Sequence, residues 1–290
     1  MVLQTVSGFF IGPLYIYFYG IVYAVAALCL YWFLSKKKDA IGITQRAVDE
    51  LIIAVLIGLI VGGRIFHFLI NDPGVFIRDP LELFLIRNGG MSFFGALIGI
   101  LCGVGIWYRI QLKLQGGNNI VANRLEMKRK MLMILDLGSL VVCIALIFGR
   151  IANFLNQELV GRIADPKLVP WCVNFATASG CRHPYQLYAA VSHLLLAVVL
   201  LVLYFRNART GTIIYTFLFG YGVLRFVTDF WREDPIVALG LTAWQFFAIV
   251  LAIVGGYLLV RHLRQGNHSE NESQTQANVQ QVHKHHKRKD

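Results

Sequence analysis

The stretch MLMILDLGSLVVCIALIFGRIANFLNQELVGR, residues 131–162, decides the fold class of this chain. Residues 131–148 carry a single charge, Asp136, and come close to the roughly 20 residues that cross the hydrocarbon core of a bilayer. Residues 149–162 then bring two arginines, three carboxamides and a carboxylate directly after the apolar run. A polar cluster in this position is typical of the point where a membrane helix leaves the lipid, so we expect a membrane protein.

The composition of the whole chain supports this interpretation. Its 290 residues are 57% hydrophobic and 15% charged, whereas soluble domains are typically about half apolar and about a quarter charged. Seven runs are long and apolar enough to span a bilayer. The sequence therefore predicts an all-α, polytopic membrane protein with seven transmembrane helices, which we place at residues 14–34, 51–70, 91–108, 131–148, 186–205, 211–230 and 241–260.

Lysine and arginine are distributed unevenly over the connecting loops. If the N-terminus lies outside, the basic residues within 36–46, 109–130 and 206–209, and those after residue 260, all lie on the inner side. The outer loops then carry far fewer. The positive-inside rule therefore predicts an N-out, C-in topology. Basic cytoplasmic loops facing anionic lipid also explain the formal net charge of +11, so we expect no nucleic-acid partner.

Three segments outside the spans define the expected domain organisation. We expect a seven-helix membrane domain over residues 1–264, with a small periplasmic cap within 150–185. A short apolar segment within 79–88 begins at Asp79-Pro80, a favourable helix start, and predicts a helix lying in the membrane interface. Residues 265–290 are rich in Gln, Asn, Ser and Glu and predict a disordered cytoplasmic tail.

Two of the five cysteines lie in the long outer loop. In the predicted topology Cys172 and Cys181 face the oxidising side, where they form either a disulfide or two unpaired thiols. The other three lie within spans and are expected to be small core residues.

Ionisable side chains within spans are the first functional candidates, because burying them in lipid is costly unless they face a polar cavity. Tyr221, Arg225 and Asp229 recur every four residues on one helix face, and Arg232 follows one turn later. Arg64 and His67 share a face of the second span, where His67 could be an ordinary hydrogen-bonded histidine. One Arg–Asp pair could simply join two helices, but several arginines with too few carboxylates indicate an anionic ligand such as a lipid phosphate.

A series of motifs between residues 11 and 260 resembles one known family, the prolipoprotein diacylglyceryl transferases of the bacterial inner membrane. The motifs are Ile11-Gly12-Pro13, Tyr17-Phe18-Tyr19-Gly20, Gly62-Gly63-Arg64, Asp79-Pro80-Leu81, Asn88-Gly89-Gly90-Met91-Ser92-Phe93, the signature from Gly149-Arg150 to Gly161-Arg162, His183-Pro184-Tyr185-Gln186-Leu187-Tyr188, Tyr221-Gly222-Val223-Leu224-Arg225 and Asp229-Phe230-Trp231-Arg232. Their order and spacing hold over most of the chain.

The resemblance implies an activity without a cofactor or metal. The diacylglyceryl group of phosphatidylglycerol would pass to the lipobox cysteine of a prolipoprotein signal peptide, and glycerol phosphate would leave. Guanidinium groups would stabilise the charge that develops on the leaving phosphate. We expect a catalytic set of Arg150, Arg225, Tyr19, Tyr221, Glu158 and Asp229, and a headgroup-binding set of Arg150, Asn153, Asn156, Gly161, Arg225, Arg232 and Arg64.

The chain departs from the family pattern at three positions. Phe94 stands where the family usually has the histidine favoured as general base, Ala189 replaces a usual glutamate, and Asp229 replaces a common glutamate. A free thiol has a pKa of about 8.5, so activating it is a reasonable task for a base. Three explanations remain open: His67 serves as the base, the reaction needs no dedicated base, or the chain binds lipid without transferring it.

Two other functions compete with the transferase. A non-catalytic paralogue would bind anionic lipid or a lipoprotein precursor and form no thioether. A transporter for small anions would favour polar residues across the whole membrane depth or repeated halves. The polar groups of this chain gather toward one side and we find no repeat, which disfavours the transporter.

Overall fold

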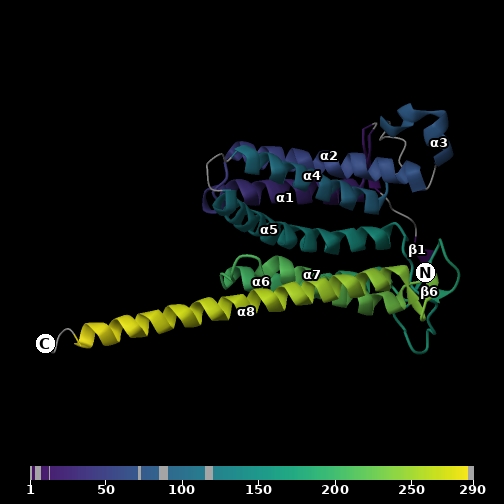
Figure 1. The fold of residues 1–290 in the computed structure, drawn as a ribbon. Helices are drawn as coiled ribbons and strands as arrows, with labels where there is room; N and C mark the ends of the chain where they lie inside the picture. The colour runs from purple at the N-terminus through teal and green to yellow at the C-terminus, as the bar shows by residue number, and fades with distance from the viewer. Residues whose placement is uncertain are drawn as a thin grey trace. The chain divides into compact units, whose positions relative to one another are not determined.

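The computed structural model describes residues 2–3, 8–12, 14–70, 73–84, 91–114 and 120–286. The chain divides into two compact units (Figure 1). The terminal unit comprises Met1–Ala26 together with Gly138–Asp290, and the middle unit comprises Ala27–Leu137.

Seven helices among the described residues are long and apolar enough to cross a membrane. They lie within α1 (Phe18–Ile41), α2 (Gln45–Ile70), α4 (Phe93–Leu114), α5 (Ile120–Leu155), α6 (Tyr185–Phe205), α7 (Thr212–Thr228, continued by the 3-10 turn η3, Asp229–Trp231) and α8 (Ala243–His286). The prediction of an all-α protein with seven membrane-spanning helices is confirmed. The N-out, C-in orientation stays a prediction.

The prediction for the start of the first span was wrong. Residues 14–17 do not begin a helix but form strand β3 (Leu14–Tyr17), which pairs antiparallel with β2 (Gly8–Ile11). Gly12 between them has a φ of +59°, a left-handed conformation that suits a tight turn and that glycine adopts at little cost. Helix α1 therefore begins at Phe18, and it continues to Ile41, beyond the predicted end at residue 34.

Other helices also extend beyond their predicted bounds, and α5 and α8 extend the furthest. Helix α5 begins at Ile120, eleven residues before the apolar run that starts at residue 131. Residues 124–130, which directly precede this run, are Arg, Leu, Glu, Met and Lys, all strong helix formers. Helix α8 continues to His286, although its candidate span ends at Gln265. This backbone differs from the disordered tail expected from residue 265, and no proline interrupts the helix there.

In the middle unit, α2 and α4 run side by side and approach closely through glycines (Figure 1). A Cβ atom added at Gly58 would lie 2.2 Å from the carbonyl oxygen of Gly99, and one added at Gly62 would lie 2.2 Å from that of Gly95. Small residues let membrane helices pack backbone against backbone. At one end of this helix pair the Trp107 indole Nε1 donates a hydrogen bond of 2.9 Å to the Ala47 carbonyl.

The predicted interfacial helix at residues 79–88 is partly present. The structure shows a short helix α3 (Pro73–Arg78) and a 3-10 turn η1 (Pro80–Phe84), while residues 85–90 lie outside the described residues. The Asp79 carboxylate accepts a hydrogen bond of 3.1 Å from the Leu81 amide, as expected for a helix start. Its position in the membrane interface stays a prediction.

In the terminal unit, α5, α6 and α7 share a hydrophobic core, and α7 runs beside α8 (Figure 1). Cys143 of α5 is fully buried in this core and its Sγ lies 3.4 Å from the His193 carbonyl oxygen of α6. The core is formed by Leu140, Cys143, Leu196, Ala197, Leu200 and Ile213. These contacts fix the register of α5 against α6, on which the candidate site depends.

Small strands join the ends of these helices. Strand β4 (Val173–Phe175) pairs with β1 (Val2–Leu3) in parallel and with β5 (Cys181–Arg182) antiparallel. Strands β6 (Ile236–Ala238) and β7 (Leu241–Thr242) form a hairpin before α8. Cys172 and Cys181 form a disulfide with a Cα–Cα distance of 5.5 Å, so the disulfide alternative is confirmed. The periplasmic location of residues 150–185 stays a prediction.

Candidate functional site

A hydrogen-bonded cluster connects α1 to the end of α5. The Tyr19 hydroxyl donates a hydrogen bond of 2.6 Å to Glu158 Oε2, and Asn153 Nδ2 donates to both groups, to Glu158 Oε2 at 3.3 Å. Asn156 Nδ2 donates to the other Glu158 oxygen at 3.2 Å. Four residues predicted for the site are therefore gathered in one cluster, here called the Glu158 cluster.

The backbone turn that carries Glu158 is tightly held. Gln157 and Leu159 on either side of it have φ values of 55° and 52°, a conformation that costs energy for residues other than glycine. Gln186 Nε2 of α6 donates a hydrogen bond of 2.6 Å to the Glu158 carbonyl, and the Thr177 hydroxyl donates one of 2.9 Å to the Gln157 carbonyl. The strained turn is thus fixed from two other segments, which indicates a position selected for its geometry.

Arg150 lies one helical turn before the Glu158 cluster on α5. Its Nη1 donates a hydrogen bond of 3.3 Å to Asn153 Oδ1, whereas its buried Nε has no hydrogen-bond partner among the described residues. The guanidinium also lies within electrostatic reach of Tyr23, Tyr185 and His193. A buried donor without a protein partner leaves Arg150 able to bind an anion.

Arg225 and Asp229 form a buried ion pair at the end of α7. Arg225 Nη2 lies 3.3 Å from Asp229 Oδ1, and the carboxylate is fully buried. The Tyr185 hydroxyl accepts a hydrogen bond from Arg225 and donates one of 3.0 Å to Asp229. The sequence placed Arg225 and Asp229 on one helix face, but it gave no indication that Tyr185 of α6 would join them.

Arg232 lies beside this pair and completes an aromatic enclosure. The guanidinium carbons of Arg225 and Arg232 lie 5.9 and 5.8 Å from the centre of the Tyr185 ring, and each lies 5.6 Å from that of Trp244. Such cation–π contacts stabilise arginines that have left water. The two arginines thus lie side by side against the same two rings, with Asp229 fully buried beside Arg225.

Asp234 supplies a second carboxylate to this group. Its Oδ2 lies 2.8 Å from Arg232 Nε, an ion pair without hydrogen-bond geometry. Burial raises the pKa of the Asp234 carboxyl, and Asp229 adds to this effect, while the arginines oppose it. The ionised carboxylate is therefore less favourable here than in water, so Asp234 neutralises Arg232 incompletely at acidic pH.

Gly161 has a backbone role in the structure. It forms a β-bridge with Arg232, and a Cβ atom at this position would lie 2.2 Å from the His183 carbonyl oxygen and 2.9 Å from that of Trp231. Only glycine fits where these three segments meet. A role for Gly161 in headgroup binding stays a prediction.

Tyr221 stacks on a histidine that sequence reasoning missed. The rings of Tyr221 and His193 lie 5.5 Å apart at 24°, and His193 is 3% exposed within α6. The imidazole Nδ1 is buried without a hydrogen-bond partner of normal geometry, and the nearby Ala189 carbonyl already accepts a bond of 2.8 Å from Ser192. An ionisable residue within an apolar span was the available signal, and it applied to His193 as well as to Arg225.

Arg64 and His67 belong to the middle unit. The buried Arg64 guanidinium donates from Nε to the Leu83 carbonyl at 3.0 Å and from Nη2 to the Glu82 carbonyl, so it holds the turn η1. Phe68 lies under Arg64 at 4.8 Å and edge-on to His67 at 5.4 Å. The headgroup role of Arg64 and the base role of His67 stay predictions.

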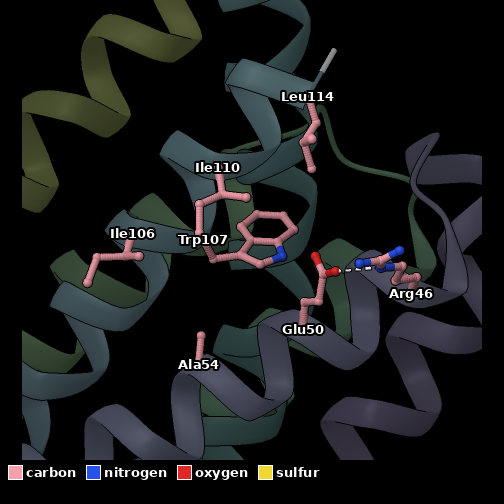
Figure 2. Close-up of a pocket in the computed structure, with 7 residues that line it drawn as sticks. All are labelled: Arg46, Glu50, Ala54, Ile106, Trp107, Ile110 and Leu114. Carbon is pink, nitrogen blue, oxygen red and sulfur yellow. Dashed lines mark hydrogen bonds and ion pairs between the residues drawn. The ribbon is translucent and has the colours of Figure 1, made fainter.

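A pocket of about 260 Å³ lies elsewhere in the middle unit (Figure 2). Glu50 within it accepts hydrogen bonds from Arg46 Nε at 2.8 Å and from Gln111 Nε2 at 2.9 Å. The lining residues are Arg46, Glu50, Ala54, Ile106, Trp107, Ile110 and Leu114. None of them belongs to the predicted site. Among the described residues, no group of three His, Cys, Asp or Glu side chains is arranged as metal ligands.

Membrane-spanning helices that carry buried arginines, with carboxamides and tyrosines around them, define a multi-pass membrane protein with a candidate anion site. The family model for "Prolipoprotein diacylglyceryl transferase" matches residues 7–261. The chain belongs to this family.

Individual relatives agree over nearly their whole length. The chain is 35% identical to the phosphatidylglycerol–prolipoprotein diacylglyceryl transferase of Methylibium petroleiphilum, over 86% of this chain and 93% of the relative. It is 34% identical to the protein of that name from Paracidovorax citrulli, over 88% and 94%. It is 36% identical to that from Wolbachia pipientis subsp. Culex pipiens, over 85% and 90%.

Proposed function

We propose that this chain transfers the diacylglyceryl group of phosphatidylglycerol to the lipobox cysteine of prolipoproteins. The names of its relatives support this activity. The observation that carries the proposal is Arg150, a span arginine whose buried Nε has no protein partner among the described residues. It lies within electrostatic reach of Tyr185, the residue that contacts Arg225. Guanidinium groups near a membrane surface suit the phosphodiester of a lipid headgroup.

The reaction is a displacement at carbon. The cysteine sulfur forms a bond to the glycerol carbon that joins the diacylglyceryl group to phosphate, and the carbon–oxygen bond to phosphate breaks. The electron pair of that bond moves to the phosphate oxygen, so glycerol phosphate leaves with one more negative charge, and the thiol proton is released. Positive groups already oriented around the phosphate stabilise this charge as it develops, because they need not reorganise.

The predicted residues divide into three roles in this proposal. Arg150 and Arg225 contact the phosphate, with Arg232 adding positive charge around it. Tyr19, Asn153, Asn156 and Glu158 bind the glycerol hydroxyls of the headgroup, since the Glu158 cluster offers both donors and acceptors. Asp229 positions Arg225, Gly161 allows the backbone to approach the headgroup, and Tyr221 lines the site.

The proposed setting is the bacterial inner membrane, with the site toward the periplasm. The distribution of basic residues supports N-out, C-in, which brings the ends of α5 and α7 that carry Arg150 and Arg225 to the outer leaflet. The disulfide between Cys172 and Cys181 supports the same orientation, because disulfides persist on the oxidising side of that membrane. The signal peptide and the lipid would both reach the site from the bilayer.

The test is a transfer assay in membranes that contain the protein, phosphatidylglycerol and a lipobox peptide, scored for the diacylglyceryl thioether. We expect product with the wild type and a loss of at least about 100-fold with Arg150→Ala, the scale on which one stabilising group in an oxyanion site acts. The matched control is Arg209→Ala, an exposed arginine before α7. Full activity of Arg150→Ala would contradict the headgroup role, and lipid binding without product in the wild type would indicate a non-catalytic paralogue.

A further inference from the structure

We propose that His193 is the catalytic base that accepts the proton of the substrate thiol. This inference rests on the proposed function, in which the proton of the thiol still lacks an acceptor. The thiol requires such an acceptor because only the thiolate is an effective nucleophile, and a free thiol is mostly protonated at neutral pH.

His193 has a ring that is fixed in place and a nitrogen whose hydrogen-bonding capacity is not fully used. The ring is buried and held in one orientation by stacking on Tyr221, and Tyr221 in turn stacks on Phe217 at 5.8 Å and 29°. Nδ1 has no hydrogen-bond partner of normal geometry among the described residues, although the Ala189 carbonyl lies nearby. A neutral imidazole has one nitrogen that donates and one that accepts, so a ring nitrogen without a protein partner is available to a substrate.

The depth of His193 matches the depth of the reacting carbon. Tyr221 precedes Arg225 by one turn of α7, about 6 Å along the helix, toward the middle of the span. In a phospholipid the carbon that joins the diacylglyceryl group to phosphate lies on the acyl-chain side of the phosphate. If Arg150 and Arg225 bind the phosphate, that carbon lies toward the layer of Tyr221 and His193, and the thiol must approach there.

The proton balance of the step is simple. The thiol proton moves to the imidazole nitrogen as the sulfur–carbon bond forms, and the carbon–oxygen bond to phosphate breaks. The imidazolium then returns its proton to the departing glycerol phosphate or to water. Both guanidinium groups lie within electrostatic reach of His193, where they favour the anionic sulfur but oppose the imidazolium, so the ring must pass its proton on as soon as the phosphate departs.

The other histidines with described side chains do not combine these features. His183 Nδ1 pairs with the Tyr188 hydroxyl at 3.3 Å, and the His67 ring lies edge-on to Phe68 rather than stacked on a tyrosine. His262 of α8 resembles His193 most closely, because it also contacts a tyrosine ring, Tyr215 at 5.4 Å, and has a buried nitrogen without a partner. It lies at the opposite end of the α7–α8 pair from Arg225, which makes it a matched control.

The experiment compares His193→Gln and His262→Gln in the transfer assay, with a lipobox peptide containing cysteine and one containing selenocysteine. A selenol is ionised at neutral pH and needs no base. We expect His193→Gln to lose at least about 100-fold in kcat/KM with the cysteine peptide, the lower range for a general base. With the selenocysteine peptide we expect less than about a tenfold loss, and His262→Gln should match the wild type with both peptides.

Two results would overturn the assignment while leaving the transferase in place. One is wild-type activity of His193→Gln with the cysteine peptide, and the other is an equal loss with both peptides, as a structural role predicts. If His193→Gln does not fold, as judged by its melting temperature in detergent, His193→Asn is measured in the same way. Absence of product from the wild type with both peptides would instead overturn the proposed function, and the role of His193 with it.

Discussion

In the terminal unit, the buried carboxylate of Asp229 holds one arginine, Arg225, in place. Asp229 is fully buried. It accepts a hydrogen bond from the Tyr185 hydroxyl and forms an ion pair with the Arg225 guanidinium. Replacing both members of a buried ion pair by apolar groups often leaves the stability of the protein unchanged. Removing only one member is strongly destabilising, because it leaves an unpaired buried charge. Asp229 therefore orients Arg225 and also offsets the cost of burying the Arg225 charge.

We therefore expect Asp229→Ala to destabilise the protein by about 3–5 kcal/mol, the usual cost of breaking a buried pair. The measurement is denaturant-induced unfolding in detergent. Glu233→Ala is the control, because Glu233 also pairs with an arginine, Arg182, but is about half exposed. Equal stability of the Asp229 and Glu233 variants would show that the Arg225–Asp229 contact contributes little.

The sequence predicted the Glu158 cluster better than it predicted the arginine enclosure. Asn153, Asn156 and Glu158 of this cluster lie within six residues of one another, so a local motif was sufficient to group them, whereas Tyr19 is distant in the sequence and was predicted from the family resemblance. Tyr185, Trp244 and His193 reach the site only because of how α6 and α8 pack against α7. That packing depends on helix register, which no single span reveals.

At the scale of elements, the glycines of α2 and α4 determine how closely these two helices approach. A Cβ atom at Gly99 would lie 1.9 Å from the Gly58 carbonyl oxygen, so the backbone would have to move. Gly105, six residues later on the same helix, has open space at this position. Substituting alanine at each of these two glycines therefore separates the effect of helix packing from the effect of helix propensity.

We expect Gly99→Ala to lower the melting temperature of the purified protein in detergent, because the α2–α4 contact must open. Gly105→Ala should leave it unchanged or raise it, since alanine favours a helix over glycine by up to about 1 kcal/mol. An unchanged melting temperature for Gly99→Ala would mean that α2 and α4 can move apart without loss of protein stability.

The elements also show where hydropathy fails as a guide. Residues 8–17 are as apolar as a span, yet they form the β2–β3 hairpin, because Gly12 allows a turn and the aromatic and β-branched residues around it suit strands. Conversely, the basic residues that begin α5 looked like a loop and are helical. Apolar runs located the membrane segments, whereas turn chemistry and helix propensity determined where the helices begin.

At the scale of the whole molecule, orientation is the main property that the sequence predicts and that experiment should test. Lys36, in the last part of α1, should face the cytoplasm, and Lys167, in the loop before β4, should face the periplasm. Both side chains are exposed.

We expect a membrane-impermeant thiol reagent added to intact cells to label Lys167→Cys and not Lys36→Cys. Both variants should be labelled after the membrane is opened, which controls for reactivity. Labelling of Lys36→Cys alone in intact cells would reverse the topology and bring the arginine site to the cytoplasmic leaflet.

Tyr185 has a consequence for how sequences of this kind can diverge. Its hydroxyl bridges Arg225 and Asp229, and its ring lies against two guanidinium groups. A substitution at Tyr185 therefore changes how well the protein tolerates substitutions at Arg225, Asp229 or Arg232. The stability effects of substitutions at these four positions should not be additive. Tyr185 is an epistatic hub, so the order in which mutations arise around it restricts which variants can be reached.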